Sequence, residues 1–207
     1  MRCFPGCRMA IVWQVFSMGK MTPLLSKDGP STEELPTPQV LAYQLKPDEA
    51  NAIPNNPRLP LLVFEGAFEI PVRDLPASIE SVFTANHWTG SWRNGIYPFH
   101  HYHSITHEVL AVYRGSADVQ FGGPRGILQT VRTGDVIIIP AGVAHRNVGA
   151  SPDFAVVGAY PDGRTLDMNY GKPGEMAAAI ANIRNVPLPR RDPVYGARGP
   201  MFEHWLE

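Results

Sequence analysis

Hydrophobic and polar residues alternate through the middle of the chain. Between Tyr97 and Tyr160, stretches with apolar residues at every second position, or with short continuous apolar runs, are separated by turn sequences such as "GGPRG", "RTGD" and "PAG". Successive side chains of a strand point to opposite faces of a sheet, so this pattern predicts a series of short strands. We expect them at residues 97–103, 107–115, 116–123, 126–134, 135–140, 144–149 and 153–160.

Two more strands and a helix are predicted ahead of this region. Weak alternation favours a strand at residues 40–45, and the apolar run "LLVFEG" favours another at residues 61–66. In residues 75–88 the period changes, because apolar residues recur at i, i+3 and i+4 from Ile79 onward. This spacing predicts a short amphipathic helix, with Ser78 as its N-cap.

The C-terminal part of the chain is predicted to be helical and then irregular. Residues 174–186 are rich in alanine and carry apolar residues at helical spacing, which predicts a helix. The proline-rich sequence after it is typical of a loop. We expect this segment to pack on the domain through Tyr195, Phe202 and Trp205.

Length and composition favour one β-rich domain. A chain of 207 residues with 44% hydrophobic residues can bury one sizeable core, and its 19 glycines and 21 prolines suit many short segments joined by turns. The polar, proline-punctuated sequence "SKDGPSTEELPTP" predicts that residues 1–39 form a flexible N-terminal arm. Residues 40–207 are then expected to form a single domain.

Charge and cysteine content exclude several classes of partner. A net charge of −1 gives no electrostatic basis for binding nucleic acid, and no apolar run approaches the roughly 20 residues that span a bilayer. Cys3 and Cys7 form neither a disulfide framework nor a zinc motif, which favours a cytoplasmic location. The alternative is an organellar address, because residues 1–20 are basic and contain no acidic residue.

Four of the seven histidines lie close together, at positions 100, 101, 103 and 107, and Glu108 follows them. On a strand, His101 and His103 share one face and His100 takes the other. Glu108 and His107 also point in opposite directions, so only one of them faces inward with the pair. Burying an ionised glutamate is costly unless a cation compensates it. Two imidazoles and a carboxylate that converge inside a barrel predict a site for a first-row transition metal.

These residues belong to two longer patterns, G-x5-H-x-H-x4-E-x6-G and, downstream, G-x5-P-x-G-x2-H-x3-N. The matching positions are Gly95, His101, His103, Glu108 and Gly115 in the first motif, and Gly134, Pro140, Gly142 and His145 in the second. Gly149 stands where the second motif ends in asparagine, a position that is not usually a ligand. In both motifs and in their order, the chain resembles the cupin family.

The resemblance implies an all-β fold, the double-stranded β-helix or jelly-roll barrel of the cupins, flanked by the two predicted helices. It implies a divalent metal inside the barrel, within residues 95–160, held by His101, His103, Glu108 and His145. The alternative ligand set has His107 in place of Glu108. Fe, Mn, Ni, Cu and Zn all accept three histidines and one carboxylate, so the metal stays open.

The likeness extends beyond the two motifs. From about residue 40 onward, the chain is similar to the YjlB-like family of small single-domain cupins from bacteria and fungi, whose activity is not settled. Cupins usually pair through exposed barrel strands, so the resemblance also implies a homodimer.

Four residues are candidates for the wall of the pocket beside the metal. Strand alternation puts Tyr97 and Phe99 on the ligand face and Asn147 on the face of His145, although Phe99 also suits ordinary barrel filling. Arg93 either attracts an anionic substrate at the barrel mouth or forms a surface salt bridge.

The function implied by these residues is that of a metal-dependent oxidoreductase of the dioxygenase kind that acts on a small organic molecule. Four protein ligands leave one or two metal positions open for substrate and oxygen. The alternatives are a metal-dependent isomerase or lyase, and a non-catalytic cupin that binds a metal or a small ligand. Asp162, Asp167 and Asn169 are candidates for a polar rim, but they suit turns equally well.

Overall fold

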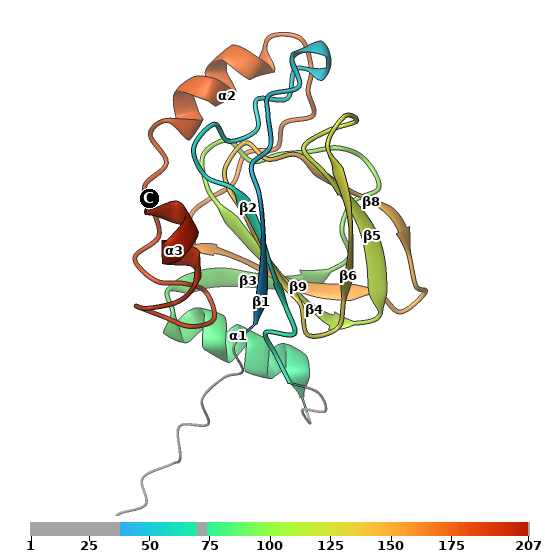
Figure 1. Ribbon diagram of the computed structural model, residues 1–207, viewed down its shortest axis with the longest axis vertical. Helices are drawn as coiled ribbons and strands as arrows, with labels where there is room; N and C mark the ends of the chain where they lie inside the picture. Colours follow the sequence, from blue (N-terminus) through green and yellow to red (C-terminus); the bar gives the residue numbers. More distant parts are fainter. Residues whose placement is uncertain (1–37, 70–73, 207) are drawn as a thin grey trace, which may run out of the picture. The chain divides into compact units, whose positions relative to one another are not determined.

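Residues 38–69 and 74–206, which the computed structural model describes, form two antiparallel sheets that face each other (Figure 1). The larger sheet has six strands in the order β1-β2-β7-β4-β9-β3, and the smaller has three in the order β6-β5-β8. The strands are β1 (Gln39–Tyr43), β2 (Leu61–Glu65), β3 (Trp88–Asn94), β4 (Glu108–Arg114), β5 (Ser116–Phe121), β6 (Ile127–Arg132), β7 (Val136–Ile139), β8 (His145–Ala150) and β9 (Ala155–Pro161). The all-β jelly-roll architecture predicted from the sequence is confirmed.

The continuous apolar runs of the sequence lie in the central strands of the larger sheet, which are buried on both faces. Every residue of β7 is buried, and so are the first four of β2. One face fills the barrel opposite the smaller sheet, through residues such as Leu61, Leu110 and Ile137, while the other packs against helices. In β5, by contrast, buried and more exposed residues alternate because its outer face meets solvent.

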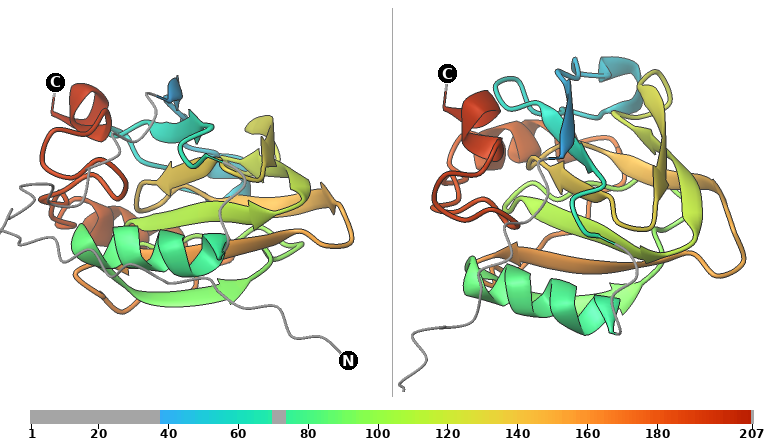
Figure 2. Two further views of the ribbon diagram at one scale, coloured as in Figure 1. Left: turned by 90° about the horizontal axis from the view of Figure 1, so that it is seen from below. Right: turned by 60° about the horizontal axis from the view of Figure 1, so that its bottom comes forward.

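Helix α1 (Leu75–Ala85) covers the outer face of the larger sheet beside β3 (Figure 2). Its N-cap is Asp74, whose side chain accepts a hydrogen bond of 3.3 Å from the backbone N–H of Ala77. The prediction that Ser78 is the cap was therefore wrong. Aspartate caps as well as serine, and Pro76 suits the first turn, so the helix begins about one turn earlier. The helix buries Leu75, Ile79 and Phe83.

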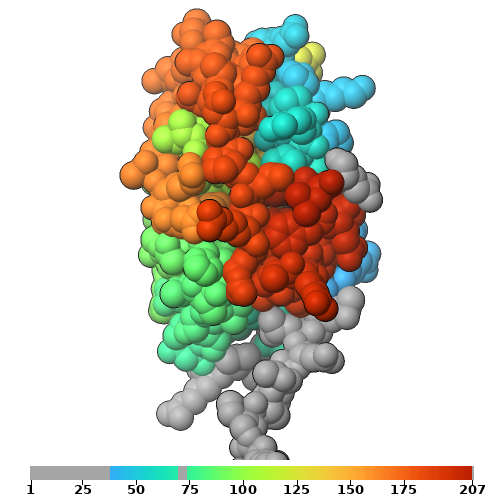
Figure 3. Space-filling view, turned by 90° about the vertical axis from the view of Figure 1, so that its left-hand side faces the viewer, coloured from blue at the N-terminus to red at the C-terminus, as the bar shows by residue number. Residues whose placement is uncertain are grey.

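The last part of the chain packs on the same outer face, through residues such as Met201 and Trp205. Helix α2 (Glu175–Ile183), which confirms the predicted helix, packs instead against a separate cluster that contains Tyr102 and Ala144. The short helix α3 (Met201–Trp205) was not predicted. Figure 3 shows the C-terminal residues (red) spread over this side of the molecule, between the α2 segment (orange) and the α1 segment (green). The predicted packing is confirmed, because Trp205 is buried in the outer core cluster and Tyr195 and Phe202 pack against it.

One predicted strand is absent, and one strand of the structure was not predicted. Residues 97–103 form no regular strand, and only His101 and Tyr102 make isolated bridges, with His145 and Asn169. Strand β3, which was not predicted, pairs with β9 through an irregular register that contains Gly90 at φ 69°. That irregularity breaks the alternation by which a strand is recognised in a sequence.

The remaining segments add little to the site. A 3-10 helix, η1 (Glu49–Asn51), follows β1. The predicted arm at residues 1–39 lies outside the described residues except for its last two, and so do Cys3 and Cys7. Among the helices of the described segments, none is long and apolar enough to cross a membrane.

Asp192 anchors the C-terminal segment, and its removal should destabilise the protein. Its fully buried carboxylate accepts hydrogen bonds from the backbone N–H groups of Val194 (2.8 Å), Tyr195 (2.9 Å) and Met201 (3.0 Å). Because these donors would lose their acceptor, we expect Asp192→Ala to lower the free energy of unfolding by about 3 kcal/mol or more, measured by urea denaturation. The exposed control Asp118→Ala should change it by less than about 0.5 kcal/mol. Equal losses in the two variants would contradict this role.

Candidate metal centre

Backbone pairing brings the two histidine motifs together. His101 and His145 exchange two backbone hydrogen bonds, of 3.2 Å and 3.0 Å, and the backbone N–H of Gly142 donates to the carbonyl of His103 at 2.8 Å. Gly142 lies at φ 92°, where a Cβ would come within 2.8 Å of the carbonyl oxygen of Asn55. Only glycine fits there without strain, so this turn depends on it.

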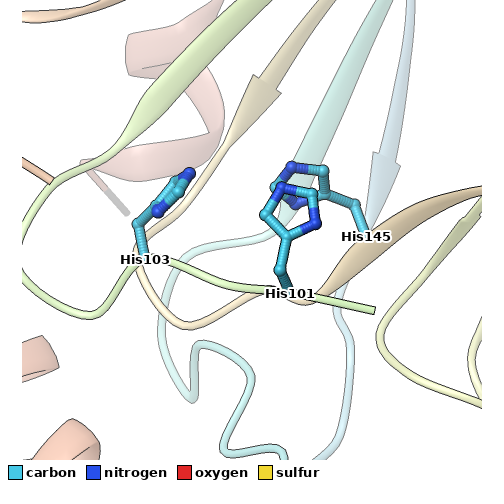
Figure 4. Close-up of side chains that lie close together, drawn as sticks. All are labelled: His101, His103 and His145. Atoms are coloured by element: carbon cyan, nitrogen blue, oxygen red, sulfur yellow. The ribbon is translucent and has the colours of Figure 1, made fainter. Parts of the chain in front are cut away.

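The side chains of His101, His103 and His145 converge inside the barrel (Figure 4). Each offers one ring nitrogen, and these three atoms lie within 4.8 Å of one another. The residues are 4%, 5% and 2% exposed. His101 comes from the segment between β3 and β4, as does His103, whereas His145 is the first residue of β8. Side chains from two parts of the chain thus meet at one buried point.

The orientation of the three rings is set by backbone carbonyls. The Nδ1 atom of His101 lies 3.2 Å from the oxygen of Phe99, that of His103 lies 2.6 Å from the oxygen of Asp167, and that of His145 lies 3.3 Å from the oxygen of Val143. A carbonyl oxygen only accepts, so each Nδ1 carries the proton. The Nε2 atoms are then left with their lone pairs, as metal-binding imidazoles require.

Glu108, the first residue of β4, lies beside the cluster. Its carboxylate oxygen Oε2 is 3.5 Å from Nε2 of His103 and 3.4 Å from Nε2 of His145. The residue is 3% exposed, and no hydrogen-bond donor of the described segments meets Oε2. Burial opposes ionisation, but the neighbouring histidines outweigh it and lower the pKa of Glu108 to about 2. The group is an anion in the barrel interior, facing the imidazoles.

His107 and His100 take other directions. The ring of His107 packs against Trp205 with 4.9 Å between centroids, and its Nδ1 accepts a hydrogen bond of 3.0 Å from the backbone N–H of Ala141. Burial lowers the pKa of His107 to about 3. His100 lies near Arg146, outside the cluster. Of the two candidates for the carboxylate position, the structure brings Glu108 to the three histidines.

The donor set fits a divalent transition metal. Three neutral imidazole nitrogens and one carboxylate oxygen, with no thiolate, suit the first-row ions named above. A buried, unpaired carboxylate oxygen is costly in itself, and a cation at this point would compensate it. The residues present therefore fit a metal, although they do not choose among Fe, Mn, Ni, Cu and Zn.

A cavity of ≈ 290 Å³ opens from the cluster. His101, His103, Glu108 and His145 form its polar floor. The larger apolar and aromatic side chains of its wall are Trp92, Ile96, Tyr97, Leu110, Tyr160, Leu166 and Met168. The cavity is large enough for a small organic molecule and would bring it against the four predicted ligands.

The four residues predicted for the pocket wall divide into two pairs. Tyr97 and Arg93 line the cavity, whereas Phe99 and Asn147 are not part of its lining. Phe99 stacks on Tyr97 with 4.9 Å between ring centroids and is 43% exposed. Arg93 forms a two-fold ion pair with Glu80, at 2.7 Å for each contact, so its charge is compensated. The salt-bridge alternative for Arg93 is the arrangement found.

Tyr160 and the carbonyl of Asp167 belong to the site but were not predicted there. Tyr160 was placed only as the last residue of a predicted strand, although it shares a face with Val156 and Gly158, and that face was the available signal. Asp167 was considered only for a rim. Its carbonyl holds His103, and its carboxylate accepts a hydrogen bond of 2.6 Å from the backbone N–H of Ser104.

Fold and site define the class of the protein. The family model described as "Cupin" matches residues 80–165, which contain all four predicted ligands. The chain is also 43% identical over 161 residues to a protein of Bacillus subtilis (strain 168) described as "Uncharacterized protein YjlB"; the match covers 78% of this chain and 94% of the relative. The chain therefore belongs to the cupin family, as a YjlB-like member.

Three solved structures that are similar to this chain match it over less than half of its length. A vicilin from Solanum melongena shares 26% identity with a TM-score of 0.32, covering 39% of this chain and 24% of the vicilin. A pumpkin seed globulin shares 22% with a TM-score of 0.34, covering 47% and 28%. A DUF861-family protein from Thermotoga maritima shares 20% with a TM-score of 0.29, covering 44% and 92%.

Removal of a single imidazole should abolish metal binding, and the neighbouring histidine provides the control. We expect His101→Ala or His145→Ala to weaken the binding of a divalent metal by more than about a hundredfold, because a direct ligand contributes more than an outer-shell partner. His100→Ala should leave the affinity within about twofold, since this ring lies outside the cluster. Competition with a chromophoric chelator measures both. Loss of metal from His100→Ala would show that the assigned ligand face is wrong.

Metal affinity should fall as the pH is lowered. Burial opposes protonation of His103, but the Glu108 carboxylate outweighs it and raises the pKa of this imidazole. Below that pKa a metal must displace the proton, so log affinity should drop by about one for each pH unit. Titrations between about pH 5 and pH 8 test this. In Glu108→Gln the fall should move to lower pH, and an affinity that does not vary over the range would contradict the assignment.

Proposed function

We propose that the protein is a metal-dependent oxidoreductase of the dioxygenase kind that acts on a small organic molecule. His101, His103, His145 and Glu108 hold the metal, and the substrate occupies the cavity above it. One observation carries the proposal: three Nε2 lone pairs and a buried carboxylate converge at the floor of a largely apolar cavity of ≈ 290 Å³.

A redox-active divalent metal held there would supply Lewis acidity and open coordination positions for a substrate donor atom and dioxygen. The protein's own residues provide the surroundings. Ile96, Leu110 and Met168 line the cavity, and their apolar side chains lower its polarity. The three backbone carbonyls keep each imidazole in one tautomer, so that the donor set is ready before metal binds.

The scarcity of acids and bases favours redox chemistry over isomerisation or elimination. An isomerase or lyase needs a group that accepts a proton from the substrate. Among the described residues of the lining, Arg93 is the only cation outside the histidine cluster, and it is paired with Glu80. The remaining titratable groups of the wall are the two tyrosines, Tyr97 and Tyr160. Of the reactions considered, a dioxygenase reaction depends least on acidic or basic side chains in the cavity wall.

The same scarcity supports a second candidate, a non-catalytic cupin that binds a metal or a small ligand. A binding protein needs a shaped cavity and a metal, but no proton relay. The two candidates differ in the metal they require, because zinc would serve binding and a redox-active ion is needed to reduce oxygen. The homodimer and the cytoplasmic location implied by the resemblance and the cysteine content stay predictions.

Protein purified without added metal should contain about one redox-active metal ion per chain, determined by elemental analysis. We expect oxygen uptake with at least one member of a panel of phenolic, thiol and keto-acid substrates, and none with His101→Ala, which lacks a metal ligand. The variant His100→Ala is the control that keeps both metal and uptake. Zinc alone, with no oxygen uptake across the panel, would overturn the oxidoreductase and support the binding protein.

A further inference from the structure

We propose that Tyr160 donates a hydrogen bond to the small molecule or anion bound at the open side of the metal, and that Trp92 and Gly158 hold its hydroxyl in place. The inference rests on the proposed function, because it requires the metal site. It goes further by naming the group that recognises the exogenous ligand and that ligand's chemistry, an oxygen or nitrogen acceptor.

Tyr160 lies where it can reach such a ligand. It belongs to β9, lines the same cavity as the three histidines and is 7% exposed. Its ring meets that of His103 edge to face, with 6.2 Å between centroids and 84° between planes. Tyr160 therefore lies in the wall of the cavity, with its ring beside one of the predicted metal ligands and little of the residue exposed to solvent.

The hydrogen bond from Trp92 determines what the hydroxyl can do. The indole N–H of Trp92 donates to the Tyr160 oxygen at 2.9 Å. An indole nitrogen only donates, so the tyrosine oxygen is the acceptor in this contact and its own proton must serve another acceptor. A phenol keeps its proton near neutral pH. The Tyr160 hydroxyl is therefore available as a hydrogen-bond donor.

The position of Trp92 depends on the absence of a side chain at Gly158. Trp92 and Gly158 are partners in the β3–β9 pairing, and the indole lies directly over Gly158. A Cβ at position 158 would come within 2.2 Å of two ring atoms of Trp92. The glycine leaves the space that the indole fills, and the indole in turn directs the Tyr160 hydroxyl.

Two acceptors are within the reach of this donor. One is the Glu108 carboxylate, whose charge and whose side-chain hydrogen bond with Tyr160 both contribute, after burial, to the raised pKa of this tyrosine. The other is a ligand in the cavity. Oε2 of Glu108 faces His103 and His145. An anion, or a molecule with an oxygen atom that accepts hydrogen bonds, would be the second acceptor when it enters the cavity. If the hydroxyl donates to Glu108, its loss should weaken metal binding. If it donates to the ligand in the cavity, its loss should weaken ligand binding.

The test uses azide as the probe and cobalt(II) as the metal, because cobalt absorption bands change when an anion binds. We expect Tyr160→Phe to raise the dissociation constant of azide about tenfold, the effect of one hydrogen bond to a charged acceptor, with cobalt affinity within about twofold of the wild type. A tyrosine outside the cavity provides the matched control. The control residue is Tyr43, which lies outside the cavity lining: Tyr43→Phe removes a hydroxyl that donates to Gln129 at 2.7 Å and should leave azide binding unchanged.

A second variant tests the orienting role of the indole and does not require the loss of the tyrosine hydroxyl. Trp92→Phe keeps an aromatic ring but removes the N–H, and it should weaken azide binding in the same direction by about two- to fivefold. In the Tyr160→Phe background the same change should have no further effect, because the indole acts only through the hydroxyl. Additive effects would overturn the part assigned to Trp92.

The outcomes separate this inference from the proposed function. A wild-type protein that binds no cobalt would overturn both. Full cobalt loading with equal azide affinity in wild type and Tyr160→Phe would overturn the inference alone. Weakened cobalt binding with unchanged azide affinity would assign the hydroxyl to Glu108 and would also overturn it.

Discussion

The buried negative charge of Glu108 is the constraint around which the site is organised. A carboxylate that is 3% exposed, and whose Oε2 meets no donor of the described segments, is expensive in an apolar barrel unless positive charge lies beside it. The imidazoles nearby can supply that charge by protonation or by holding a cation. His101 and His145, whose pKa values are lowered mainly by burial, resist protonation. Only the pKa of His103 is raised, because there Glu108 outweighs burial, so a proton on His103 and a metal ion compete to compensate the carboxylate.

Hydrogen bonds of the main chain position the predicted metal ligands. The paired backbones of His101 and His145 set the spacing between the two motifs, and carbonyl oxygens select the tautomer of each ring. Neither function depends on a charged side chain that could move. The central strands of the larger sheet, packed on both faces, give the first residue of β4 a fixed position, and with it the Glu108 carboxylate. The site is therefore organised by the barrel itself.

Much of the fold could be predicted, since long apolar runs and a strict period of two identify buried strands. The shared face of His101 and His103 also followed from alternation, even though their segment is not a regular strand. Alternation needs only an extended backbone, and the isolated bridges at His101 and Tyr102 preserve it. Strand β3 escaped detection because an irregular register at Gly90 interrupts its pattern. Tyr160 could not be assigned a role without it, since its partner Trp92 lies on that strand.

The short segment around Asp167 links the cavity wall to the metal ligands. Leu166 and Met168 line the cavity, while the carbonyl of Asp167, between them, holds the Nδ1 proton of His103. The wall of the cavity and the hydrogen bond that orients one predicted ligand are therefore built from three consecutive residues. A substitution at Leu166 or Met168 that alters the shape of the cavity is expected to alter the orientation of the His103 ring as well.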